Sequence, residues 1–232
     1  RPHIALITTV GPAHIEHFRD ESGIADAKGE VFEGLVEGGT AIIPADNSHY
    51  SRLRSKAELH AGKVISFGFS EGADVRCLDH VPSADGGSLV TAKLGATLLC
   101  YTISQPGLRW ISNSLAVLAA VEAAGADLAA AGLALSDLGG LKGRGARHSI
   151  AIAGGPALLI DESYNANPVS MRATMSELAR TAGDRRVAIL ASMKELGPDS
   201  ARFHAELKGP LEQAGVGYTL LVGEEMAALA KA

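Results

Sequence analysis

The sequence predicts an α/β fold made of two successive domains, and three observations lead to that prediction. Short apolar strand-like runs alternate with helical segments at both ends of the 232-residue chain, which is typical of parallel strands joined by crossover helices. Hydrophobic residues make up 47% of the chain and charged residues 20%, enough apolar side chains for buried cores. The segment Leu138 to Arg147 is rich in glycine and charge. We therefore expect domains over residues 1–138 and 139–232.

The first domain begins with strand–helix alternation and continues with strands alone. Strands are expected at 4–7, 40–43 and 64–67, with helices at 24–35 and 48–60 between them. In the first of these helices Ile24, Val31 and Leu35 lie on one side. The strand-like runs 74–81, 88–93 and 96–103 are separated by turns too short for a helix, which predicts an antiparallel meander beside the parallel strands. Two helices follow, at 111–124 and 127–134.

The second domain returns to strand–helix alternation and is expected to be a small doubly wound α/β unit. Its strands are predicted at 149–152, 157–160, 187–190 and 219–222, and its helices at 169–181, 200–214 and 224–231. Asn167 and Pro168 form a natural helix start, because asparagine caps the first turn and proline tolerates the first helical position.

Composition excludes several classes of protein. The net charge of −5 argues against a nucleic-acid partner bound through a broad basic face. No apolar run approaches the roughly 18–20 residues of a membrane span. Cys77 and Cys100 lack metal-site spacing and are too few for a disulfide scaffold, so a cytoplasmic location is expected. Because the chain starts at Arg1 and runs directly into a strand, we expect it to be an internal fragment of a longer polypeptide.

Two candidate residues lie in the first domain. His14 follows the first strand, at the edge where parallel sheets bind ligands. It is a candidate metal ligand, general base or phosphate contact, or a loop histidine with a local hydrogen bond. Lys28 lies between small residues on a helix. It is either a solvated lysine or an amine that reacts with carbon dioxide, and the resulting carbamate would offer oxygen ligands to Mg²⁺.

In the second domain, polar residues follow two buried strands. The stretch Asp161 to Pro168 combines acids and amides, which suit ribose hydroxyls and polar substrate groups. Met193 to Gly197 follows the next strand and is either a ligand-binding loop or an ordinary connection. Arg144 and Arg147 are candidates for phosphate or carboxylate pairing, or are simply solvated. The phosphate-loop, dinucleotide-binding and nucleophile-elbow motifs are all absent from the sequence.

Taken together, three segments of the chain resemble the Mur ligase family. They are Thr8 to Phe18 with Ala27 to Glu30, Asn113 to Ala120, and Asp161 to Met171 with Met193 to Gly197. The resemblance covers nearly the whole chain. It implies the remainder of a central mononucleotide-binding domain, without its phosphate loop and N-terminal domain, followed by a truncated Rossmann-like ligase domain.

The resemblance implies ATP-dependent amide-bond formation through an acyl phosphate, in the synthesis of peptidoglycan precursors. The string Ser163 to Pro168 is similar to the branch of the family that adds D-alanyl-D-alanine to the UDP-N-acetylmuramoyl (UDP-MurNAc) tripeptide. The implied partners are small molecules, and the implied enzyme is a cytoplasmic monomer. The fragment itself would be inactive without the missing phosphate loop.

The family resemblance also implies roles for individual residues. His14 would bind Mg²⁺, and Lys28 would be carbamylated beside the same ion. Asn113 would approach the adenine and Arg144 the nucleotide phosphates. Either Asp161 or Glu162 would hold the ribose, a choice that the sequence leaves open. The peptide substrates would meet the four remaining candidates, Tyr164, Asn165, Asn167 and Glu195.

Two other functions remain open at this point. The first is a sister ligase with the same mechanism, resembling MurE or folylpolyglutamate synthase. The second is a non-catalytic nucleotide-binding or interaction module that lacks the phosphate loop.

Overall fold

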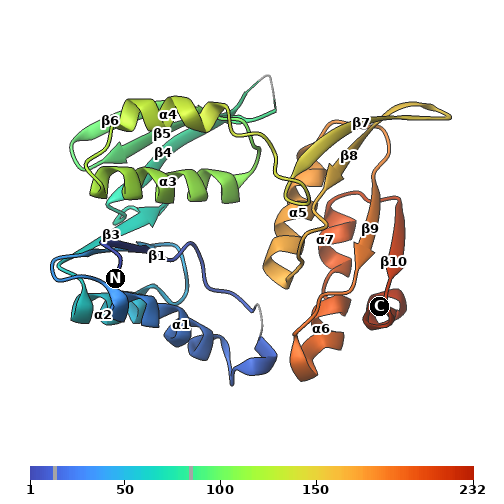
Figure 1. The fold of residues 1–232 in the computed structure, drawn as a ribbon. Helices are drawn as coiled ribbons and strands as arrows, with labels where there is room; N and C mark the ends of the chain where they lie inside the picture. The colour runs from blue at the N-terminus through green and yellow to red at the C-terminus, as the bar shows by residue number, and fades with distance from the viewer. Residues whose placement is uncertain (13–14, 84–85) are drawn as a thin grey trace. The chain divides into compact units, whose positions relative to one another are not determined.

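The computed structural model describes residues 1–12, 15–83 and 86–232. It divides into two compact units: unit 1 comprises Arg1–Val10 and Glu21–Gly139, and unit 2 comprises Gly11–Asp20 and Gly140–Ala232. Both units contain strands and helices (Figure 1), so the predicted α/β class is confirmed. His14 lies outside the described residues.

The first half of unit 1 is a parallel sheet with helices on both faces. The strands are β1 (Ile4–Leu6), β2 (Thr40–Pro44) and β3 (Lys63–Gly68), paired in parallel in that order. The helix α2 (Tyr50–His60) lies on one side of this sheet and α3 (Leu108–Ala123) on the other (Figure 1). The predicted alternation of strand and helix is therefore confirmed.

The first helix is shorter than its apolar pattern predicts. α1 covers Glu21–Gly29 and continues as the 3₁₀ segment η2 (Glu30–Gly34). Gly29 lies buried against α2, where a Cβ atom would come within 2.7 Å of Lys56 Cδ. Glycine permits this close approach but is a poor residue for continuing an α-helix.

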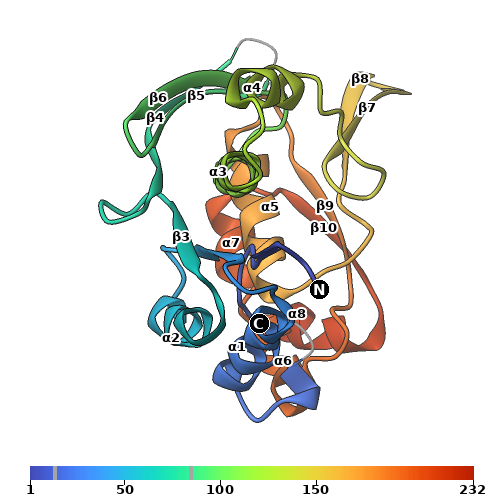
Figure 2. The same ribbon diagram turned by 60° about the vertical axis from the view of Figure 1, so that its left-hand side comes forward.

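The second half of unit 1 is the predicted antiparallel meander, which extends the same sheet. β4 (Val75–Pro82), β5 (Ser88–Leu94) and β6 (Thr97–Ile103) pair in order, while β3 and β4 pair over only two residues each. Figure 2 shows α3 and α4 (Leu128–Ser136) beside these strands. The buried core between them includes Leu94, Tyr101 and Leu118.

Unit 2 contains one antiparallel hairpin and one parallel pair of strands. β7 (Ala146–Ile152) pairs with β8 (Gly155–Asp161), whereas β9 (Val187–Ala191) pairs in parallel with β10 (Tyr218–Val222). The doubly wound arrangement thus covers β9 and β10, and β8 does not join it. Two residues separate β7 from β8, which permits a hairpin but no crossover.

Helices and a core dominated by methionine and leucine complete unit 2. Met193, Leu207 and Met226 are its largest fully buried side chains. The single helix expected over 200–214 is two helices, because Pro210 has no N–H for the carbonyl of Glu206. The helical segments are η1 (Ile15–His17), α5 (Pro168–Arg180), η3 (Gly197–Asp199), α6 (Ser200–Ala205), α7 (Lys208–Gln213), η4 (Glu224–Met226) and α8 (Ala227–Lys231). Among the described residues, none of the helices is long and apolar enough to cross a membrane.

Candidate functional site

The most fully bonded candidate in unit 2 is Asp161, the last residue of β8. Its Oδ2 accepts a hydrogen bond from the Gly143 N–H at 3.0 Å. Its Oδ1 accepts from the Ser163 hydroxyl at 2.6 Å and the Ser163 N–H at 3.1 Å. These bonds lower the pKa of Asp161, with the Ser163 hydroxyl contributing most. Asp161 is therefore an oriented, ionised carboxylate that can accept hydrogen bonds from ligand hydroxyls.

The glycine-rich segment 143–145 is held against the residues that follow β8. Tyr164 donates its N–H to the Gly143 carbonyl at 3.1 Å, and Gly145 donates its N–H to the Asp161 carbonyl at 2.9 Å. Gly143 has φ +73°, and a Cβ there would lie 2.9 Å from the Tyr164 backbone nitrogen. The guanidinium carbon of Arg144 lies 4.2 Å from the centroid of the Tyr164 ring, a cation–π contact. The structure thus brings Arg144, Asp161 and Tyr164 together.

Asn165 and Asn167 both have local roles. The Asn167 Oδ1 accepts from the Val169 N–H at 3.0 Å and the Ser170 N–H at 2.9 Å, and the Ser170 hydroxyl accepts from the Asn167 N–H at 3.0 Å. This capping box confirms the predicted start of α5. Asn165 uses its Oδ1 to accept from the Ala166 N–H at 2.9 Å. Within the described part of the chain, neither side-chain NH₂ group has a hydrogen-bond partner, so both can donate to a ligand.

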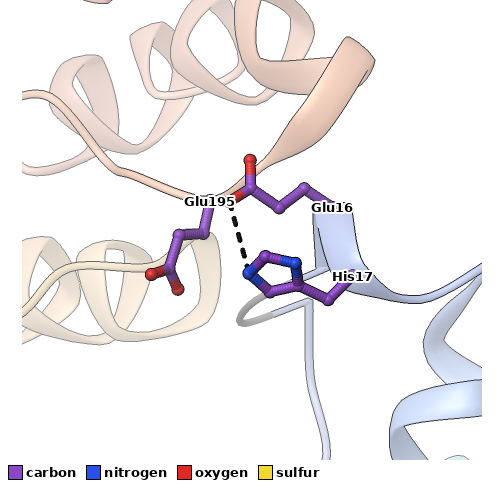
Figure 3. Close-up of side chains that lie close together, drawn as sticks. All are labelled: Glu16, His17 and Glu195. Carbon is purple, nitrogen blue, oxygen red and sulfur yellow. Dashed lines mark ion pairs between the residues drawn. The ribbon is translucent and has the colours of Figure 1, made fainter.

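Glu195 lies in the loop after β9, beside two residues of the η1 segment (Figure 3). It has φ +60°, and its carbonyl accepts from the Glu16 N–H at 3.3 Å. One ligand atom from each of Glu16, His17 and Glu195 lies within 4.8 Å of the other two, and His17 Nε2 is 3.5 Å from Glu16 Oε1. Carboxylate oxygens and an imidazole nitrogen are suitable ligands for a divalent cation.

Glu195 was a candidate from the sequence, whereas Glu16 and His17 were not. The available signal was their position shortly after His14, within the segment Thr8 to Phe18 that carries the family resemblance. The contact between Glu16 and Glu195 joins residues 179 positions apart, and sequence spacing does not predict such a contact. The segment 11–20 clusters with unit 2, and the assignment of residues 1–138 to the first domain stays a prediction.

A buried histidine holds the loop that carries Glu195. His204, on α6, is fully buried. Its Nε2 accepts from the Met193 N–H at 2.9 Å, and its Nδ1 lies 2.7 Å from the Ser200 carbonyl oxygen. Because that carbonyl only accepts and the Met193 N–H only donates, these contacts assign the neutral tautomer with hydrogen on Nδ1.

An ion pair links the loops that follow β9 and β10. Lys194 Nζ lies 2.5 Å from Glu225 Oε1. The hydrogen bond from Lys194, followed by one from Ser192, lowers the pKa of Glu225 to about 2. Both residues follow the carboxyl ends of parallel strands, where α/β units bind ligands.

The remaining candidates differ in how they are placed. Lys28 is exposed in the last turn of α1, and Asn113 is exposed on α3. In the described ranges neither side chain has a hydrogen bond or ion pair, so both are available to a ligand. Glu162 is half-buried directly after β8. The pairing of His14 with Lys28 stays a prediction, because His14 lies outside the described residues.

Two polar residues after β2 join the neighbouring strand ends of unit 1. Asn47 donates from Nδ2 to the Val10 carbonyl at 2.8 Å and to Thr9 Oγ1 at 3.3 Å. Asp46 accepts from the N–H groups of Phe69 at 2.7 Å and Ser70 at 2.8 Å. The sequence analysis missed both, although an Asp-Asn pair after a buried strand is the same signal that singled out Asp161.

Two family models match the chain. The Mur ligase middle domain matches residues 1–121, and the Mur ligase glutamate ligase domain matches residues 146–232. The UDP-N-acetylmuramoyl-tripeptide–D-alanyl-D-alanine ligase of Escherichia coli K12 is 33% identical over 232 residues, which is 100% of this chain and 50% of that protein. The chain thus spans about half the length of the curated relatives it matches.

Solved structures are similar as well. MurF from Acinetobacter baumannii superimposes with a TM-score of 0.88 at 29% identity, over 99% of this chain and 49% of that one. MurF from Thermotoga maritima, solved in complex with ADP, has a TM-score of 0.78 at 24% identity, over 99% and 55% of the two chains. The order of elements in both units is therefore shared with known folds.

Proposed function

This chain belongs to the Mur ligase family, and from that premise we propose that it carries nucleotide- and substrate-binding parts of an ATP-dependent peptidoglycan ligase. The proposed reaction joins D-alanyl-D-alanine to the UDP-MurNAc tripeptide. The observation that carries this proposal is the similarity to the E. coli ligase along the entire chain. The proposal assigns residues 1–138 to a central nucleotide-binding domain and 139–232 to the ligase domain of a cytoplasmic, monomeric enzyme.

The nucleotide residues follow from the chemistry of the described side chains. ATP, when bound, converts the substrate carboxylate to an acyl phosphate that an amine can attack. Asp161 is the better candidate for the ribose, because its carboxylate is ionised and fixed by three hydrogen bonds. Arg144, oriented by its contact with Tyr164, would neutralise phosphate oxygens. Asn113 is exposed on α3 and would donate to or accept from the adenine.

The metal residues of the proposal are His14 and Lys28. Lys28 is exposed and unpaired within the described ranges, so its amine is accessible to carbon dioxide. A carbamate at Lys28 would present oxygen atoms, which are the donors that Mg²⁺ prefers. The bound ion would neutralise charge on the transferring phosphoryl group.

The peptide substrates are assigned to the loops after β8 and β9. The free NH₂ groups of Asn165 and Asn167 can donate to peptide carbonyls or to a terminal carboxylate. Glu195 carries the opposite charge and would orient an ammonium group. Tyr164 is 68% exposed and would supply apolar contact area while its backbone remains fixed to Gly143.

The proposed function is tested with the complete protein encoded by the gene. It would be incubated with ATP, the UDP-MurNAc tripeptide and D-alanyl-D-alanine, and the products followed by mass spectrometry. Ligation of the dipeptide is the expected result. Ligation of a single amino acid instead would identify a sister ligase, and nucleotide binding without any ligation would identify a binding module.

The role of Lys28 has its own test. Lys28→Ala in the complete protein should lower kcat by about 10–100-fold, the usual effect of losing a group that supports a metal site, and added acetate should partly restore it. Lys231→Ala, at an exposed lysine of α8, is the matched control and should leave kcat unchanged. Unchanged turnover in Lys28→Ala would reject the carbamate role.

A further inference from the structure

A polar cavity opens in unit 1 where β3 and the β4–β5 hairpin diverge. Within the described residues, β3 pairs with β4 only at Phe67 and Gly68, so the amino-terminal part of β3 has no strand on that side there. The resulting cavity has a volume of about 380 Å³. The charged residues that line it are Lys63, Glu71, Asp74, Arg76, Lys93 and Glu122.

Two of the cations in this lining are cross-strand neighbours on one face of the sheet. Arg76 on β4 is the direct antiparallel partner of Lys93 on β5. Side chains of directly paired residues share one face of the sheet, and like charges there destabilise the pairing. Lys63 adds a third positive charge to the same lining.

Arg76 also has a hydrogen-bond donor without a partner. Its Nε is buried and makes no hydrogen bond within the part of the chain that the structure describes. A buried, unsatisfied donor is unfavourable. The contact with Glu71 is long, at 3.8 Å, and Glu71 is 94% exposed, so solvent screens this pair.

The lining holds as many carboxylates as cations, but apart from the long Arg76–Glu71 contact the described residues show no ion pair between them. One carboxylate oxygen of Asp74 already accepts from the Ser66 N–H at 2.8 Å and the Ser66 hydroxyl at 2.6 Å. Across the described ranges, Lys63, Lys93 and Glu122 form no ion pairs. Lys63 and Lys93 are therefore cations of this lining without a carboxylate partner in the described ranges.

We propose that this cavity is an oxyanion site, in which a group of the phosphate class binds between Arg76, Lys93 and Lys63. Guanidinium groups match the geometry of phosphate oxygens, and lysines add charge without a fixed direction. Binding would place negative charge beside the two cross-strand cations and relieve the repulsion between them. None of these residues takes part in the proposed ligase reaction.

The test is calorimetric titration of the 232-residue chain with inorganic phosphate at constant ionic strength. We expect saturable binding that weakens about tenfold in Lys93→Gln, because a charge-assisted contact is lost. Lys231→Gln removes the same charge from an exposed helix and should leave the Kd unchanged. Lys93 is exposed, so its replacement should not disturb folding, which circular dichroism would verify.

A second arm identifies the source of the anion. Tighter binding of pyrophosphate than of phosphate, lost in Lys93→Gln, would indicate a diphosphate group. Equal binding of the two would indicate a single phosphate group. No saturable binding of either anion, or the same Kd in Lys93→Gln as in Lys231→Gln, would overturn the proposal.

Discussion

Replacing His204 with leucine should destabilise unit 2 mainly through the loss of the hydrogen bond that His204 accepts from the Met193 N–H. His204 is fully buried, and Met193, whose N–H it accepts, is 1% exposed. Leucine is close to histidine in volume, so the cavity contribution is small. The Met193 N–H would lose its acceptor without gaining water, which costs about 1–3 kcal/mol.

The expected loss is therefore about 2 kcal/mol in the free energy of unfolding. For a chain of this length, that corresponds to a decrease of roughly 4–8 °C in Tm. His204→Gln is the informative second variant, because the Gln Oε1 can accept from the Met193 N–H and should recover part of the loss. His60→Leu, at an exposed histidine that ends α2, is the matched control.

Differential scanning calorimetry and urea unfolding would measure all three variants. The reasoning fails if His204→Leu unfolds within about 0.5 kcal/mol of the unmodified chain, the range of ordinary surface substitutions. It also fails if His204→Gln is as unstable as His204→Leu, because an acceptor for the Met193 N–H would then contribute nothing to the free energy of unfolding. Either result would mean that the contact with Met193 does not hold the loop after β9.

The remaining predictions concern stability at two other places, the Tyr101–Ser114 hydrogen bond and the Asn167 cap of α5. Tyr101→Phe removes the buried bond between the Tyr101 hydroxyl and Ser114 Oγ at 2.7 Å and should cost about 1 kcal/mol in urea unfolding. Burial raises the pKa of Tyr101 to about 12; the folded state therefore holds this proton more tightly, and stability present below about pH 10 is lost as the pH rises towards 12. Tyr101→Phe should flatten that alkaline loss, and Tyr218→Phe, at an exposed tyrosine, should not. Asn167→Ala should cost about 1 kcal/mol by removing the cap of α5, whereas Asn165→Ala should cost less than half as much in the same assay; equal losses would contradict the capping role.

Helices and strands whose boundaries depend on residues close together in the sequence were predictable from the sequence. α5 begins at Pro168 because Asn167 caps it and proline tolerates the first turn, and both properties are local. The meander of β4 to β6 was predictable because its connections are too short for helices. The break in the helix at Pro210 and the β7–β8 hairpin also depend on local sequence. The prediction was wrong at both places because it followed the apolar periodicity and gave too little weight to the proline and to the short connection between the strands.

Residues of the candidate site could be predicted from the sequence, but most of the contacts between them could not. Asp161, Arg144 and Tyr164 were each singled out by position after a strand or within a glycine-rich segment. That Gly143 donates to Asp161 and accepts from Tyr164 depends on how two segments meet. No role could be assigned to His204 from the sequence, because burial is a property of the packed core rather than of the local sequence.

The chain alone therefore determined which segments become strands and helices, where α5 starts, and which polar residues stand at strand ends. These outcomes depend on backbone conformation and side-chain periodicity over a few positions. Only the tertiary structure decided that Glu16 meets Glu195, that Arg76 is the cross-strand neighbour of Lys93, and that His204 is buried beneath Met193. Such contacts join residues that are distant along the chain, and strand register and core packing select them for the fold as a whole.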